Sequence, residues 1–195
     1  MTQTQKPVTT PSAEGIAQAA TRATQKGLAP VHLWNPPFCG DLDMEIRRDG
    51  TWFYLGTPIG RPALVRLFAS VLKREGDAYF LVTPVEKVGI RVVDAPFVAV
   101  DFDLTDEGEN QTVTFTTNVG DRVSANAANP IRVAYASDGE PAPYIHVRRG
   151  LEALIDRKSF YRLVDIARPG THDGEQWLGL RSAGVFFPII AMADL

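Results

Sequence analysis

The chain has 195 residues, of which 45% are hydrophobic and 22% charged, and its formal net charge is −3. This composition is ordinary for a folded soluble protein, and the acidic balance argues against nucleic-acid binding as the main activity, because neutralising phosphates requires a basic surface. A single cysteine, Cys39, excludes an intrachain disulfide framework and a multi-cysteine metal site. No apolar run is long enough to cross a bilayer and the N-terminus lacks a secretory core, so we expect a cytoplasmic protein with neither membrane nor nucleic acid as partner.

Residues 1–30 are expected to form a tail and a short helix. Met1–Thr10 should be mobile, and Ser12 can cap an alanine-rich helix that runs to about Lys26, shortly before Pro30. The apolar face of this helix is thin, so we expect it to pack weakly or against a partner.

An acidic hairpin follows the helix. Residues 41–47 alternate apolar and charged side chains, residues 51–55 form a second extended run, and Asp49-Gly50 between them favours a tight turn. The pattern predicts a half-buried strand whose outer face is acidic. The inward residues are Leu42, Met44 and Ile46, and the outward acids are Asp41, Asp43 and Glu45.

The stretch from Trp52 to Lys87 is expected to organise the chain as strand, turn, helix, turn and strand. Pro62 suits the first helical position, where its missing N–H loses no hydrogen bond. Apolar residues then recur at helical spacing as far as Leu72. The basic residues 73–74 suit the negative end of the helix dipole, and Gly76 is expected to end the helix.

The remaining elements are mostly strands. The clearest hairpin joins residues 97–105 to residues 111–117, and a second helix is expected from Arg157 to Ala167. Short connections predict mostly antiparallel sheets and therefore an α+β fold. Alternation in the first hairpin strand predicts one shared face for Val98, Val100, Phe102 and Leu104. Further strands are expected at 78–82, 88–93, 131–135, 144–148, 175–181 and 185–190.

The strand-turn-helix-turn-strand pattern occurs twice. Leu55–Phe68 aligns with Leu151–Val164, and Arg61 falls on Arg157. The alternative is that any amphipathic helix between strands aligns equally well. Repetition favours two small strand-rich domains, which we expect at 31–96 and 97–195.

Six segments of the chain are distinctive: Cys39–Met44, Asp49–Arg61, Leu81–Lys87, Asp94–Val98, Thr117–Asp121 and Tyr144–Ala153. Together they resemble the bacterial domain-of-unknown-function family DUF1285, and the resemblance extends from Trp34 to Pro188. It implies a two-domain α+β fold with repeated motifs and a role in signal transduction. It implies no catalytic residues.

The acidic strand face is a candidate metal site. Asp41 and Asp43, with Glu45, place carboxylates two residues apart on one face, and carboxylates are the ligands of Mg²⁺ and Ca²⁺. Asp101 and Asp103 repeat this spacing. The alternative for both pairs is a solvated strand face.

The two aligned arginines are candidate anion ligands. Arg61 and Arg157 stand at the starts of their helices, where free backbone N–H groups also favour phosphate or carboxylate. No Gly-Lys-Ser/Thr follows the turn before Arg61, so this turn is not a P-loop. The alternative is that both arginines form ion pairs within their domains.

A strand break at Pro84 supplies the last candidate site. Thr83, Glu86 and Lys87 flank the break, and polar residues at such positions are plausible ligand contacts. The alternative is an irregular edge strand with an ordinary ion pair.

These observations support three hypotheses about function. The first is a non-enzymatic regulatory or signal-transduction module that binds a small anionic ligand or a protein partner and needs no cofactor. The second is a metal-dependent hydrolase or transferase that uses Asp41, Asp43 or Glu86. The third is a homodimeric scaffold, in which the apolar segment Phe186–Ile190 packs against another subunit unless it forms an internal strand.

Overall fold

The structure is a computed structural model that describes residues 10–24, 28–106, 108–135 and 139–194. It divides into two compact units, Met1–Ile46 with Thr51–Val92, and Arg47–Gly50 with Val93–Leu195. Both units are rich in antiparallel strands, which confirms the predicted α+β class with two domains. The predicted tail falls almost entirely outside the described residues. Within them, no helix combines the length and apolarity needed to cross a bilayer.

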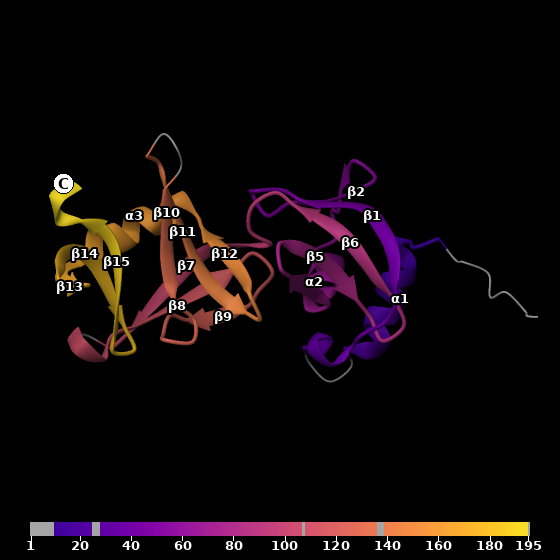
Figure 1. Ribbon diagram of the computed structural model, residues 1–195, viewed down its shortest axis with the longest axis horizontal. Helices are drawn as coiled ribbons and strands as arrows, with labels where there is room; N and C mark the ends of the chain where they lie inside the picture. The colour runs from indigo at the N-terminus through magenta and orange to yellow at the C-terminus, as the bar shows by residue number, and fades with distance from the viewer. Residues whose placement is uncertain (1–9, 25–27, 107, 136–138, 195) are drawn as a thin grey trace, which may run out of the picture. The chain divides into compact units, whose positions relative to one another are not determined.

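The first unit is built on a six-stranded sheet in the order β3-β2-β1-β6-β5-β4 (Figure 1). Neighbouring strands are antiparallel except for the central pair β1 and β6, which is parallel. The sequence did not predict this parallel pair, because short local connections reveal only hairpins. The strands are β1 Phe38–Ile46, β2 Trp52–Tyr54, β3 Thr57–Pro58, β4 Leu72–Glu75, β5 Ala78–Val82 and β6 Lys87–Val92.

Two helices cover one face of this sheet, α1 (Ala13–Ala23) and α2 (Pro62–Ser70). The predicted alternation in β1 is confirmed: Leu42, Met44 and Ile46 are buried, and the acids between them lie on the other face. Trp52 of β2 stacks on Phe68 of α2 with ring centroids 6.2 Å apart, and both side chains are fully buried. Ser12 caps α1 as expected, accepting from the Gly15 N–H. A short 3₁₀ turn, η1 (Val31–Leu33), precedes β1.

The end of α2 was predicted wrongly. The helix ends at Ser70 instead of reaching Gly76, and Leu72–Glu75 forms strand β4. Leu72 pairs with Leu81 and Glu75 with Ala78, with Gly76 at positive φ in the turn between them. Hairpin pairing to β5 therefore outweighs the helical spacing, which is a weak local preference that tertiary context can override.

The second unit contains a six-stranded sheet in the order β10-β11-β12-β7-β8-β9. Its central pair, β7 and β12, is again parallel, and the other pairs are antiparallel. A register shift between Ala99 and Asp101 leaves Val100 exposed, so the predicted single apolar face of β7 is wrong at this bulge. The strands are β7 Phe97–Thr105, β8 Thr112–Thr117, β9 Arg122–Ser124, β10 Ile131–Tyr135, β11 Pro141–Arg148 and β12 Leu151–Ile155, with the 3₁₀ turn η2 Gly108–Asn110.

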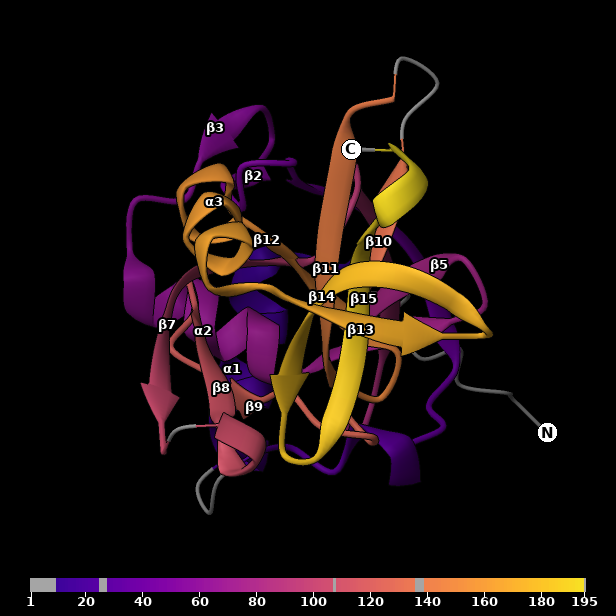
Figure 2. The ribbon, with the colours of Figure 1, turned by 90° about the vertical axis from the view of Figure 1, so that its left-hand side faces the viewer.

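A helix and a three-stranded sheet complete this unit (Figure 2). The helix α3 (Arg157–Ile166) has nearly the predicted bounds and packs against β7. The sheet is tied to the six-stranded sheet by Ser182, whose buried hydroxyl accepts from Val113 N–H and donates to the Ala125 carbonyl. The segment Phe186–Ile190 lies in β15, an edge strand of this sheet whose Phe187 and Ile189 side chains are buried within the unit, and the homodimer stays a prediction. The strands are β13 Arg168–His172, β14 Glu175–Ser182 and β15 Val185–Ala191, followed by the 3₁₀ turn η3 Met192–Asp194.

The internal repeat takes a different form from the predicted alignment. A strand, a helix and a hairpin follow one another in both units, but the helices occupy different topological positions. Helix α2 connects the two edge strands of its sheet, whereas α3 leaves the central strand β12. The repetition lies in the six-stranded sheets. When the strands of each sheet are numbered 1 to 6 along the chain, their spatial order in both sheets is 3-2-1-6-5-4.

Candidate functional site

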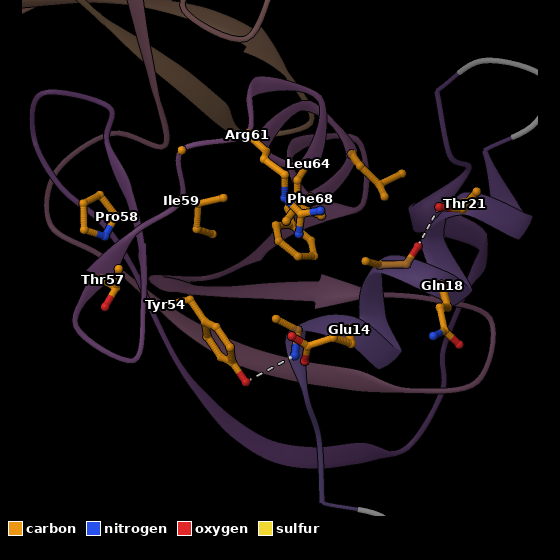
Figure 3. Close-up of a pocket in the computed structure, with 14 residues that line it drawn as sticks. Glu14, Gln18, Thr21, Tyr54, Thr57, Pro58, Ile59, Arg61, Leu64 and Phe68 are labelled. Atoms are coloured by element: carbon orange, nitrogen blue, oxygen red, sulfur yellow. Dashed lines mark hydrogen bonds between the residues drawn. The ribbon is translucent and has the colours of Figure 1, made fainter.

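One candidate site of the first unit is a pocket of about 540 Å³ between α1, α2 and the β2–β3 hairpin (Figure 3). Phe68 is fully buried in its lining, and Ile59, Leu64 and Leu67 are half-buried there. Tyr54 is also half-buried, and the other polar side chains that line the pocket are exposed at its rim. Pockets of this size, apolar with few polar groups, are typical of small-molecule sites. The rim residues include Glu14, Gln18, Thr57 and Arg61.

Arg61 supplies the positive charge of this pocket. It is the N-cap residue of α2, and its carbonyl accepts from the Leu64 and Val65 N–H groups. Among the described residues its guanidinium forms neither an ion pair nor a hydrogen bond, and the side chain is exposed. An arginine next to a helix N-terminus combines a fixed positive charge with the positive end of the helix dipole. This corner of the pocket therefore favours an anion.

Helix α1 forms the opposite wall. It is anchored by the buried side chains of Ile16 and Ala20 and by a long hydrogen bond, 3.5 Å, from the Ala13 N–H to the Tyr54 hydroxyl. Glu14 lies near this hydrogen bond, on the other side of the pocket from Arg61 (Figure 3). The predicted apolar face thus packs into the unit through Ile16 and Ala20, and the neighbouring residues Ala13, Ala17 and Gln18 line the pocket.

Comparison with known proteins places the chain. The family model for the DUF1285 N-terminal domain, a domain of unknown function, matches residues 29–95. The model for the DUF1285 C-terminal domain, a protein of unknown function, matches residues 96–189. The chain belongs to the DUF1285 family. Membership confirms the resemblance found in the sequence.

Two crystal structures of DUF1285 proteins are similar to this one. The protein from Silicibacter pomeroyi DSS-3 is 61% identical with a TM-score of 0.84, over 94% of this chain and 98% of the other. The protein from Shewanella baltica OS155 is 32% identical with a TM-score of 0.52, over 64% of this chain and 91% of the other. No protein with a curated description matches the chain.

Two predicted residues of this DUF1285 protein meet on the open face of the first sheet. Asp41 of β1 and Lys87 of β6 line a groove of about 480 Å³ with Phe80 and Arg91. The Lys87 ammonium lies 2.9 Å from Glu75. Hydrogen bonds from Lys73 and from Lys87 lower the pKa of the Glu75 carboxyl. The ion pair of the alternative interpretation therefore exists, with Glu75 of β4 as its acid, but Lys87 belongs to a central strand and not to an edge strand.

The other residues at the strand break serve the backbone. Thr83 is fully buried, and its hydroxyl accepts from the N–H groups of Val85 and Glu86. Burial raises the pKa of the Glu86 carboxyl. Neither Thr83 nor Glu86 lines the groove that contains Lys87. The break is thus a closed turn, and the predicted three-residue cluster is not assembled there.

The acids predicted as metal ligands are dispersed. Asp101 forms an ion pair with Arg162, which lowers the pKa of the Asp101 carboxyl, and Asp103 pairs with Arg122 at 2.8 Å. Asp43 shares a strand face with Asp41 but lies outside the groove. Over the described ranges, no three or more His, Cys, Asp or Glu side chains are grouped so as to hold a metal ion.

Arg157 differs from Arg61 in position and in pairing. Arg157 is the first residue of α3, whereas the cap itself is Asp156, whose carboxylate accepts from the Ser159 N–H at 2.7 Å. The Arg157 guanidinium donates to the Tyr161 hydroxyl at 3.0 Å and lies 3.7 Å from Glu140. Hydrogen bonding to Tyr161 raises the pKa of Arg157. The ion-pair alternative thus describes Arg157, and the anion-site hypothesis is concentrated on Arg61.

Sequence reasoning missed most of the pocket around Arg61. Tyr54 and Ile59 carry no signature of a binding residue, and Glu14 belongs to a helix far away in the sequence. The only available signal was the narrow apolar stripe of α1, which is too thin to bury a helix by itself.

Proposed function

We propose that this protein is a non-enzymatic regulatory module whose first unit binds a small amphipathic anion. The observation that supports it is Arg61, an arginine without an acidic partner among the described residues, at the rim of an apolar pocket. In this proposal the anionic group of the ligand binds the guanidinium, and its apolar body packs against Leu64, Leu67 and Phe68.

The chemistry of the pocket defines the ligand class. A guanidinium binds carboxylate and phosphate with two parallel hydrogen bonds, which gives both affinity and direction. The half-buried side chains of Ile59, Leu64 and Leu67 offer a contact surface that an inorganic ion would leave unfilled. A ligand with one anionic group and an aliphatic or aromatic body uses both features.

Helix α1 provides the route from binding to a signal. It forms one wall of the pocket, and its own anchors in the unit are Ile16, Ala20 and one long hydrogen bond. A ligand that contacts both α1 and α2 stabilises the docked helix, because it binds the docked arrangement better than the open one. The accessible surface of α1 then differs between the filled and the empty pocket, and a protein partner that binds this surface can distinguish the two states.

Octanoate is the probe for the proposed pocket, with octan-1-ol as its uncharged analogue. A hydrogen bond to a charged group contributes about 1.5–3 kcal/mol, so Arg61→Ala should weaken octanoate binding about tenfold or more and leave octanol binding unchanged. Arg66→Ala is the matched control, since Arg66 is an exposed arginine of the same helix outside the pocket. Isothermal titration calorimetry measures the binding of both probes to the wild-type protein and to each of the two variants.

Two results would contradict the proposal. One is octanoate binding that Arg61→Ala and Arg66→Ala affect equally. The other is a wild-type protein that binds neither probe. Hydrogen exchange adds the test of the signal, because octanoate should slow exchange in α1 of the wild-type protein.

A further inference from the structure

The central parallel pair of the first sheet is irregular around Asp41. The register between β1 and β6 shifts on both sides of this residue, between Phe38 and Asp41 and between Asp41 and Glu45. Gly40 just before it has a φ of 103°. Bulges occur often beside functional sites, where they redirect a side chain.

Asp41 and its partner across the pair form a close contact. Asp41 is paired in register with Gly89, and a Cβ on Gly89 would lie 2.1 Å from the Asp41 Oδ1. The carboxylate therefore lies flat across the strand, where any other residue would exclude it. Asp41 has no hydrogen-bond or ion-pair partner among the described residues. Aspartate and glycine are both disfavoured in strands, and a glycine in a strand often marks a place where a ligand or another backbone approaches closely.

The second sheet provides an internal comparison. Its central parallel pair has the same topological position and remains in register through three successive pairs, Phe97 with Ala153, Val98 with Leu154 and Ala99 with Ile155. These residues are apolar and mostly buried. The topology alone therefore does not require the irregularity at Asp41. Departures from local rules without a structural reason are expected at functional positions.

The groove around Asp41 combines aromatic and basic walls. Phe38 is 55% exposed and meets Phe80 edge to face, with ring centroids 6.1 Å apart. Lys87 and Arg91 flank Gly89 on β6, two residues away on either side, so all three share one face of the strand. Each cation is already paired, Lys87 with Glu75 and Arg91 with Glu45.

We propose that this groove binds a guanine nucleotide. The Asp41 carboxylate accepts hydrogen bonds from the two adjacent N–H donors on the guanine edge, N1–H and the 2-amino group. The guanine ring packs against the exposed Phe38, since the Lys87 ammonium already lies 4.8 Å from the centroid of the Phe80 ring, and the phosphate lies towards Lys87 and Arg91. A metal ion fits less well, because Lys87 and Arg91 line the groove together with Asp41 and Asp77, and among the described residues no three metal-ligating side chains are grouped to hold one. The site is separate from the Arg61 pocket and independent of its proposed function.

The test is calorimetric titration with GMP, IMP and AMP. GMP should bind about 10- to 100-fold more tightly than AMP, which presents an acceptor where guanine presents a donor, and IMP should lie between them. Asp41→Asn should reverse the preference towards AMP, because an amide offers one donor and one acceptor. Asp43→Asn is the matched control, an equal charge change on the same strand face outside the groove, and it should keep the preference for GMP.

Three outcomes would overturn the proposal. They are no saturable binding of GMP by the wild-type protein, equal binding of GMP and AMP, and an Asp41→Asn protein that keeps the wild-type preference. Arg61→Ala should leave GMP binding unchanged. If Arg61→Ala abolished it, the nucleotide would occupy the other pocket and the assignment to Asp41 would be wrong.

Discussion

Two glycine substitutions should have opposite effects on stability, although both residues lie in strands and both would bring a Cβ into close contact. At Gly89 the nearest atom is the carboxylate oxygen of Asp41, at 2.1 Å, on an exposed side chain that can rotate into solvent. At Gly179 the nearest atoms are the Phe187 carbonyl oxygen, at 2.4 Å, and the Phe186 ring, at 2.6 Å.

These neighbours determine the magnitudes. Replacing glycine by alanine reduces the entropy of the unfolded chain and stabilises by about 0.4–1 kcal/mol where the native backbone tolerates it. Gly89→Ala should therefore leave the free energy of unfolding unchanged or raise it by up to about 1 kcal/mol. Overpacking against atoms that cannot move costs about 1–3 kcal/mol, so Gly179→Ala should lower stability by about 2 kcal/mol.

Urea denaturation measures both variants, with native-state hydrogen exchange to resolve the units. Exchange in β6 should be unchanged or slower in Gly89→Ala, and exchange in β14 should be faster in Gly179→Ala. A loss of more than about 2 kcal/mol in Gly89→Ala would refute the reasoning, since it would mean that Asp41 cannot leave its place without disturbing the sheet. A gain of stability with lost GMP binding would separate the role of Gly89 in binding from any role in folding.

Three further predictions concern single side chains of the two units. Burial, followed by a 2.7 Å hydrogen bond to Asp94, raises the pKa of Tyr144 from 10.0 to about 12. The fold therefore favours the neutral phenol. The neutral Tyr144 phenol contributes fully to the free energy of unfolding below pH 10, and this contribution is lost as the pH rises towards 12. Tyr144→Phe should therefore weaken the fall in stability that urea denaturation measures across that pH range. Asn118→Ala removes hydrogen bonds to Val98 N–H and to the Gly50 carbonyl and should cost about 1–3 kcal/mol by the same assay. Phe68→Ala leaves a cavity beside Trp52, should cost about 3–5 kcal/mol, and should change the near-ultraviolet circular dichroism of that tryptophan.

The hairpins were predictable because their information is local. Asp49-Gly50 specifies the turn between β1 and β2, and alternation in β1 separates its two faces, as the structure confirms. The same locality explains the error at α2. Leu72 continues the helical spacing of the preceding residues, and only its partner in β5 makes it a strand residue.

The parallel pairs were beyond local reasoning. The register of β1 with β6 joins residues almost fifty positions apart, for example Phe38 with Lys87, and no turn links them. The repeat was obscured for a related reason. Similar amphipathic helices and matching arginines drew the alignment onto α2 and α3, while the topologically equivalent strands, such as β6 and β12, differ in sequence.

The candidate sites also divide into features that the sequence reveals locally and features that depend on the tertiary structure. Arg61 could be proposed as an anion ligand from its place before Pro62 at the start of a helix, and the structure adds the apolar pocket that Arg61 lines. Thr83 could be proposed only from polarity near a strand break, and its hydroxyl is consumed by the turn. A side chain on a loop becomes a candidate when its hydrogen-bonding capacity is left over after the backbone has been satisfied, which the sequence does not reveal.

The two six-stranded sheets allow a comparison of a regular and an irregular parallel pair within one molecule. Asp41–Gly89 and the pairs around Val98–Leu154 occupy the same central position in two sheets of identical strand order, so the demands of strand order are equal at both. One solution is regular and apolar, as burial favours. The other keeps an unpaired carboxylate over a glycine between two register shifts. If strand order alone produced the second arrangement, the first would share it. The guanine-nucleotide site proposed at Asp41 supplies a reason for the difference, and the comparison of GMP with AMP tests it.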